Sequence, residues 1–244
     1  DIGSFSATGK MVTAGFGGIE QTVAERSDKD DYQYQFTTSA DLGRLLPEKA
    51  KVSVPVYYSY SKHIVKPKYN PLDTDMLLSE ALDATQTQEE KDSIISLTTT
   101  SSVNRNFSIT GAKVNIASKK HPMPYDPANF TFSYSSSESE DKGETTVYEY
   151  NKSWKASMSY AWSPNWKNWE PFSKWSTKNK WAQIIKDQNI AFAPQSVTFN
   201  TDLGRTYYEL QERDLENIGN SQALPVTWSS TYLWNRNFSL RWDI

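Results

Sequence analysis

The sequence predicts an all-β protein: an antiparallel wall segment of a transmembrane β-barrel, with about eight strands and two partly helical inserts. Three observations point to this class. Apolar and polar residues alternate with a period of two along several segments, which indicates strands with one apolar face. Most of these segments reach the roughly 9–11 residues that a tilted strand needs to cross a bilayer. Aromatic residues make up 14% of the chain, whereas soluble cores rely more on Leu, Ile and Val.

Six segments carry the alternation most clearly. They are 31–43, 52–60, 130–138, 148–162, 197–207 and 226–242. In the last segment, Trp, Tyr, Phe and Leu share one face, while Ser, Thr and Asn occupy most of the other. Pro55 lies inside 52–60, and because proline cannot donate a ladder hydrogen bond, we expect a bulge or a local break in pairing there.

Two further segments are predicted to be strands with irregularities. In 103–117 the apolar phase shifts at Gly111, which predicts a β-bulge. In 4–24 the glycines of 15–18 predict bends or a close approach of two backbones.

Short polar stretches at 45–49 and 137–143 are predicted to be turns. The first insert, about 62–102, contains two helical patterns. One begins near Asp73 or Thr74, and Thr87 caps the other, with Glu90 three residues later. Three strands separate this insert from the second, about 164–194, so we expect the two inserts on opposite sides of the sheet.

The second insert is rich in Trp and Lys. Three interpretations remain open: a segment at the membrane interface, a surface for protein docking, or a small Trp-rich core under a long loop. The candidate residues for an interfacial or docking role are Trp166, Trp169, Trp175 and Trp181.

Alternation alone also fits a soluble lipocalin-like barrel or a sandwich, in which the apolar face points inward. Strand length and aromatic residues near strand ends favour a membrane barrel, whose apolar face meets lipid and whose polar face lines a wet lumen. The lipid-facing candidates are Trp228, Tyr232, Trp234, Phe238, Leu240, Trp242, Trp154, Tyr160 and Trp162. The lumen-facing candidates are Asn235, Asn237, Ser239, Arg241 and Asp41.

Two short motifs recur with the same flanking apolar phase. D-L-G-R occupies 41–44 and 202–205, and N-R-N-F-S occupies 104–108 and 235–239. We interpret both as recurring strand chemistry, because the spacing between the motifs differs in the two halves of the chain.

Composition and motifs argue against an enzyme. The chain has no Cys, two His and a formal net charge of −3, and it lacks the common hydrolase, nucleotide-binding and zinc-protease motifs. We expect His63 and His121 in solvated loops. We therefore expect no catalytic residue, no cofactor, no metal and no nucleic acid partner.

Several long motifs resemble the SprA family, also called Sov. They are S-A-T-G-K-M-V-T-A-G-F-G-G-I-E-Q at 6–21, P-K-Y-N-P-L-D at 67–73, P-M-P-Y-D-P-A-N-F at 122–130, F-N-T-D-L-G-R-T-Y-Y-E-L-Q-E-R-D-L at 199–215 and L-W-N-R-N-F-S-L-R-W-D at 233–243. The resemblance spans essentially the whole chain.

This resemblance implies an outer-membrane translocon of the bacterial type IX secretion system. Such proteins form one very large barrel with a lateral opening, so 1–244 is expected to be part of that barrel wall. The partners implied are the rest of the barrel, a PorV-like shuttle protein, a plug protein, secreted cargo proteins and outer-membrane lipid. In gliding species the same pore exports adhesins to the cell surface.

Two other functions stay open at the level of sequence. One is a complete, small, eight-stranded outer-membrane protein that serves as an anchor or adhesin. The other is a soluble β-barrel that binds a small apolar ligand.

Overall fold

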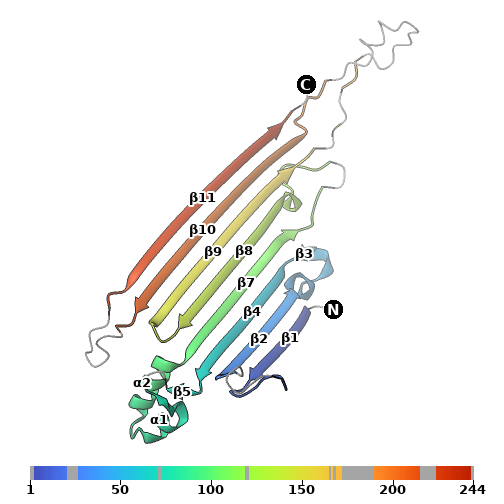
Figure 1. Ribbon diagram of the computed structural model, residues 1–244. Coiled ribbons are helices and arrows are strands. Elements are labelled where there is room, and N and C mark those ends of the chain that lie inside the picture. Colours follow the sequence, from blue (N-terminus) through green and yellow to red (C-terminus); the bar gives the residue numbers. More distant parts are fainter. Residues whose placement is uncertain are drawn as a thin grey trace.

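A single open antiparallel sheet dominates the computed structural model (Figure 1). The structure describes residues 3–20, 27–70, 73–118, 121–164, 166, 169–171, 190–214 and 224–242. Eight strands follow one another along the main path of the sheet: β1 (Gly3–Val12), β2 (Lys29–Asp41), β4 (Pro55–Pro67), β7 (Thr100–Val114), β8 (Phe130–Lys142), β9 (Thr146–Trp162), β10 (Ser196–Glu212) and β11 (Thr227–Arg241). The prediction of an antiparallel sheet with about eight strands is confirmed.

The sheet does not close into a barrel. In the described part of the chain, β1 pairs with β2 alone and β11 pairs with β10 alone, so each has one free edge. Between these edges, every strand is bonded to its neighbours on both sides. The sheet is therefore an open meander with two unpaired edge strands.

Shorter elements lie at the two ends of the strands. β5 (Tyr69–Asn70), β6 (Asp73–Leu77), α1 (Leu78–Ala84) and α2 (Gln88–Thr98) follow β4 at one end. The other end carries η2 (Leu42–Leu45), η3 (Glu48–Ala50), β3 (Val52–Ser53) and η4 (Pro127–Asn129) (Figure 1). The described residues 163–164 and 190–195 belong to this second end, so the two predicted inserts leave the sheet at opposite ends.

The helical insert differs from expectation at its start. Thr87 caps α2 as predicted, since its hydroxyl accepts a hydrogen bond from the Glu90 N–H. α1 begins after Leu77 and not near Asp73 or Thr74, because 73–77 forms β6 and pairs with β5. Among the described residues, no helix has the length and hydrophobicity required to span a membrane.

Two strand boundaries and one register shift test the sequence pattern. β4 starts at Pro55, and the register shifts between Ile109 and Ala112, where Gly111 has a φ of 67°. The break and the bulge are therefore confirmed. β1, by contrast, ends at Val12 because a turn follows at Gly15, whose φ is 89°.

The predicted turn at 137–143 is wrong, because β8 continues to Lys142. Its Ser and Glu residues suggested a turn, but Glu138 on β8 pairs with Lys152 on β9 and keeps the strand in the sheet. The first insert is likewise shorter than 62–102, because β4 runs to Pro67 and β7 starts at Thr100.

The sheet is a single layer without a core of its own. The buried hydrophobic residues in the described regions are few and lie outside the main strands: Leu78, Ala81, Leu97 and Ala191. Large side chains on the sheet are instead exposed, with Phe238 at 68% and Trp228 at 66% of their full accessibility. A sheet usually buries one face against another layer, but the described residues supply no such layer for this one.

Candidate functional surfaces of the sheet

Strand register sorts the side chains onto two chemically distinct faces. Directly paired residues of neighbouring strands lie on the same face, so the pairings can be followed from β11 to β1. The face that includes Trp234 is here called the aromatic face, and the face that includes Asn235 is called the polar face. Their contrast in composition makes these two surfaces the candidate functional site.

Rings and aliphatic side chains line the aromatic face across all eight strands. Phe238 pairs with Phe199, and Phe199 pairs with Tyr160. Tyr160 in turn pairs with Phe130 at 5.0 Å between ring centroids. Further members are Phe5, Met11, Tyr32, Tyr34, Phe36, Tyr58, Tyr60, Phe107, Ile109, Phe132, Tyr134, Trp154, Met158, Trp162, Leu203, Trp228, Tyr232 and Leu240.

Three indole N–H groups, two on this face and that of Trp242 just after β11, have hydrogen-bond acceptors. Trp234 Nε1 donates to Thr201 Oγ1 at 2.8 Å, Trp162 Nε1 donates to the Pro122 carbonyl at 2.9 Å, and Trp242 Nε1 donates to the Ala191 carbonyl at 2.9 Å. A partnered indole can enter an apolar medium at lower cost, because its only polar group is satisfied.

A row of charged side chains limits the apolar part of the aromatic face. Lys152 on β9 lies 2.5 Å from Glu138 on β8, and Arg105 on β7 lies 3.8 Å from the same carboxylate. The three residues are cross-strand partners. On the other side of this row, toward Trp154 and Phe107, the described residues of these strands on this face are apolar or carry hydroxyl groups.

This limit runs obliquely across the strands. The row that contains Lys152 and Arg105 reaches β2 at Phe36, through Tyr60 on β4. The first charge on this face of β2 is Asp30, six residues further along from Phe36. The limit stays level from β9 to β7, lies two residues further along β4 at Lys62, and lies six further along β2 at Asp30. Over the four steps from β9 to β2 this averages about 1.5 residues per strand. Strands 4.8 Å apart and tilted by 35–45° would shift a flat membrane boundary by about 1.0–1.5 residues per strand.

Arg236 is an exception inside the apolar band. Besides Arg205 on β10, which pairs directly with Trp154 and Tyr232, it is the one charged side chain that the described strands place between the charged limit and the strand ends at Trp162 and Trp242. Its guanidinium stacks on the ring of Trp234, with 4.2 Å between its carbon and the ring centroid.

The polar face consists mainly of short hydroxyl and amide side chains. Ser133, Ser135, Ser137 and Ser139 follow one another along this face of β8. Side-chain hydrogen bonds join neighbouring strands on this face. The hydroxyl groups of Ser4 and Ser39 lie 2.8 Å apart, and the Asn106 amide donates to the Ser59 hydroxyl at 3.2 Å. Such a surface binds water readily and offers little apolar area.

Charges on the polar face form pairs in two places. Lys155 on β9 lies 3.3 Å from Asp202 on β10, and His63 Nε2 on β4 lies 2.9 Å from Asp31 on β2. His63 is therefore a half-buried strand residue, and its predicted position in a solvated loop is wrong. His121 is exposed outside the strands, as expected.

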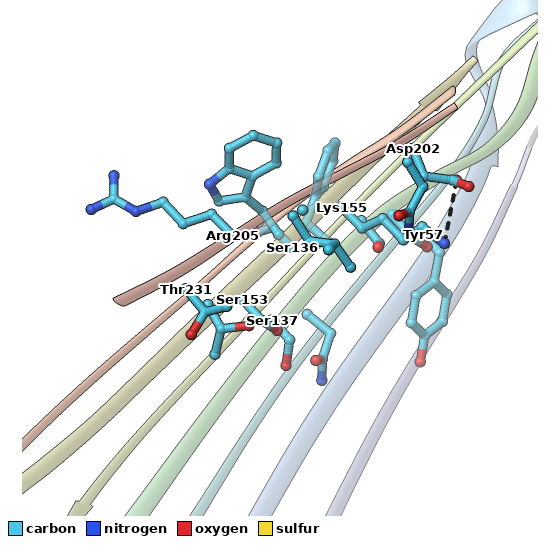
Figure 2. Close-up of a pocket in the computed structure, with 17 residues that line it drawn as sticks. Tyr57, Ser136, Ser137, Ser153, Lys155, Asp202, Arg205 and Thr231 are labelled. Carbon is cyan, nitrogen blue, oxygen red and sulfur yellow. Dashed lines mark ion pairs between the residues drawn. The ribbon is translucent and has the colours of Figure 1, made fainter. Parts of the chain in front are cut away.

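A hollow of about 500 Å³ lies on the polar face, and Figure 2 shows its lining with the Lys155–Asp202 ion pair. Residues of six strands, β4 and β7 to β11, line this hollow. They include Tyr57 on β4 and Thr231 on β11. Most of the lining residues belong to the polar face, whereas Phe107, Ser136, Trp154 and Arg205 belong to the aromatic face.

The predicted site residues separate by face in the structure. On β11 and β9, the lipid-facing candidates lie on the aromatic face, as the pairings of Trp228, Tyr232, Phe238 and Leu240 with β10 show. Asn235, Asn237, Ser239 and Arg241 lie on the polar face. Whether these faces meet lipid and water remains a prediction.

Asp41 lies on the polar face at the end of β2, but its carboxylate has a local structural role. It accepts hydrogen bonds from the N–H groups of Gly43 and Val54 and from the Ser53 hydroxyl, at 2.8–3.1 Å. Asp41 therefore holds the turn after β2 together.

The Trp-rich insert is described only in part. Trp166 and Trp169 are 51% and 52% exposed, and the Trp169 ring lies 5.7 Å from that of Phe192. Backbone hydrogen bonds of 2.9 Å join Trp169 to Ile190 in both directions. Trp175 and Trp181 lie outside the described residues.

The P-M-P-Y-D-P-A-N-F motif forms an ordered loop against the aromatic face. Asp126 is buried, and its carboxylate accepts hydrogen bonds from the Ser118 N–H, the Ser118 hydroxyl and the Met123 N–H. These bonds, the Ser118 N–H foremost, hold the pKa of Asp126 below its ordinary value. The Tyr160 hydroxyl donates to the Pro124 carbonyl at 2.9 Å and fastens the loop to β9.

Sequence reasoning missed the pairs that depend on register: the charged row of Arg105, Glu138 and Lys152, the Lys155–Asp202 ion pair and the stacking of Arg236 on Trp234. The repeated N-R-N-F-S motif was the available signal for two of them. It places an arginine on the aromatic face of both β7 and β11.

Comparison with known proteins identifies one related family. Residues 1–82 match the family model SprA_N, described as motility related/secretion protein. The match confirms, over these residues, the resemblance found in the sequence, and it associates the chain with motility and secretion. No curated protein matches the chain.

Proposed function

From the secretion family matched by residues 1–82 and the two-faced sheet, we propose that this chain forms part of the wall of an outer-membrane β-barrel translocon for type IX protein secretion. The aromatic face contacts lipid, and the polar face lines a water-filled path for secreted proteins and, in gliding species, adhesins. We assign no catalytic role to the described residues.

The oblique apolar band is the observation that carries this proposal. A soluble sheet would need a second layer over its aromatic residues, and no described element supplies one. Lipid would cover a band of this kind, and tilted barrel strands would give the observed shift of about 1.5 residues per strand.

The polar face suits conduction without binding. Its serines, threonines and asparagines bond to one another and to water, and Lys155 pairs with Asp202. The hollow extends over six strands. A passing protein would meet few exposed apolar groups and few unpaired charges there.

The open sheet favours a wall segment over the two alternatives. A small complete barrel and a soluble ligand-binding barrel both require β1 to pair with β11, yet each keeps a free edge in the described chain. Free edges inside lipid are costly, because their N–H and C=O groups lack water. Further strands beyond β1 and β11 would complete the barrel, and a shuttle or plug protein would act at its lateral opening.

Arginine substitutions on adjacent residues of β11 test the proposal. Phe238 lies on the aromatic face and Asn237 on the polar face. Phe238→Arg should destabilise the assembled protein by about 2–4 kcal/mol, because it places a charge on the lipid side. Asn237→Arg should assemble normally.

Heat-modifiable migration of the full-length protein on gels, measured in isolated outer membranes, reports assembly. Equal tolerance of Phe238→Arg and Asn237→Arg would contradict the lipid assignment of the aromatic face.

A further inference from the structure

Among the described residues, Arg236 lies on an edge strand of the sheet and forms no ion pair with a carboxylate. On the paired side, its direct neighbour on β10 is Thr201. Its guanidinium stacks on Trp234 within its own strand. In the described part of the chain, no strand pairs with the outer side of β11.

The same motif shows what surrounds such an arginine inside the sheet. Arg105 occupies the equivalent place in N-R-N-F-S and also lies on the aromatic face. Tyr60 on one neighbouring strand faces its guanidinium at 6.0 Å from the ring centroid, and Glu138 on the other neighbour lies at 3.8 Å. The arginine of β7 thus lies between a ring and a carboxylate. For Arg236 the ring is that of Trp234 on its own strand, the neighbour on β10 is Thr201, and the second neighbouring strand would be the one outside β11.

Two physical requirements meet at this edge. The guanidinium fork pairs best with a carboxylate when water is excluded, and charged groups in membranes are usually paired. The backbone of β11 also needs hydrogen-bond partners along its outer side. One additional strand with a suitably placed acid would satisfy both.

We propose that the outer edge of β11 pairs with a strand that carries an Asp or Glu on the aromatic face, within salt-bridge distance of Arg236. The partner is thus a β-strand of defined chemistry at a defined place. The inference rests on the proposed function for its apolar surroundings, whereas the Arg105 comparison is independent of lipid.

Replacement of Arg236 by leucine tests whether a carboxylate or only lipid lies next to the Arg236 guanidinium. If a carboxylate lies opposite, Arg236→Leu leaves it unpaired, and the assembled fraction of the full-length protein should fall about tenfold or more. If Arg236 faces lipid alone, the same change removes a charge from lipid, and assembly should equal or exceed that of the wild type. Thr201→Leu, at the paired position on β10, is the control and should assemble normally.

Photo-crosslinking then identifies the partner. A benzophenone amino acid in place of Phe238, the next residue on the same face, should crosslink to a peptide with alternating polarity and an acidic residue. Neutralising that acid should restore the assembly of Arg236→Leu. Crosslinks to lipid alone, or an Arg236→Leu protein that assembles normally, would overturn the inference. Failure of the proposed function is separate, since it would appear as tolerance of Phe238→Arg.

Discussion

Gly43 and Gly204 occupy the same place in the repeated D-L-G-R sequence but face different surroundings. Gly43 is buried in the η2 turn, where a Cβ atom would lie 2.1 Å from the Val52 carbonyl oxygen. Gly204 lies within β10, and the nearest atom to a Cβ there is the Trp154 carbonyl oxygen at 3.7 Å. The interpretation of both copies as strand chemistry is therefore wrong for the first, which continues from the end of β2 into a turn.

Substitution by alanine should therefore have different effects on stability at Gly43 and at Gly204. Gly43→Ala should destabilise the turn by about 1–3 kcal/mol, because the backbone of Val52 must move. Gly204→Ala should be neutral or slightly stabilising, since alanine loses less backbone freedom than glycine. Hydrogen exchange of 41–54 in the two variants measures the difference, and equal protection would refute the close approach at Gly43.

Asp126 gives the loop between β7 and β8 a defined dependence on pH. Hydrogen bonds from Ser118 and Met123 lower its folded-state pKa. A lowered carboxyl pKa adds stability that is fully present above the unfolded pKa and is lost as pH falls through the folded one. The effect therefore belongs to the range below about pH 4.

The loop should open as the pH falls through that range. Hydrogen exchange of 121–130 should increase below about pH 4 in the wild type. Asp126→Asn should show faster exchange at neutral pH and little further change on acidification, because its amide cannot accept the same bonds as an anion. Asp83→Asn, at an exposed position of α1, is the control. Acid-insensitive exchange in the wild type would contradict the role of Asp126.

At the level of elements, α2 illustrates a boundary that local sequence determines. The Thr87 hydroxyl accepts a hydrogen bond from the Glu90 N–H. Arg213, the residue after β10, donates to the Ser96 carbonyl in the last turn of the helix at 3.1 Å. Thr87→Ala should cost about 1 kcal/mol of helix stability, whereas Thr87→Asp should retain the cap. Exchange protection of 88–98 measures both, and an unchanged Thr87→Ala protein would show that packing alone sets the helix start.

Local patterns predicted the elements better than their limits. The alternation identified both faces of β9 and β11, Gly111 marked the bulge, and Pro55 marked the start of β4. The prediction of a turn at 137–143 was wrong because this segment continues β8 and stays paired with β9. Its polar residues lie alternately on the two faces of the strand. A period of two cannot reveal whether an all-polar stretch stays in a sheet.

The candidate surfaces were predictable only as faces. Their register-dependent parts, such as Arg105 with Glu138 and Lys155 with Asp202, join residues far apart in the sequence. Alternation is unchanged when a strand slips by two residues, so it cannot select these partners. For the same reason, the slope of the apolar band can be obtained only from the register of the five strands from β9 to β2.

For the molecule as a whole, the proposed function gives the two faces of the single-layer sheet different environments. The described residues bury almost no hydrophobic core, and the aromatic face leaves Phe238 and Trp228 largely exposed. Water on both faces would leave a large apolar patch uncovered, which soluble monomers rarely tolerate. Under the proposed function, lipid covers the apolar side chains of the aromatic face and water solvates the hydroxyl and amide groups of the polar face.

Spin-label accessibility along β11 tests this central claim most directly. The sequence has no Cys, so single cysteines at 231–240 can be labelled in the full-length protein in lipid once any cysteines elsewhere are replaced. Labels at Tyr232, Trp234, Phe238 and Leu240 should collide mainly with oxygen, and labels at Thr231, Leu233, Asn235, Asn237 and Ser239 mainly with a water-soluble nickel complex. The account predicts this alternation with a period of two, and equal accessibility to the nickel complex on both faces would contradict it.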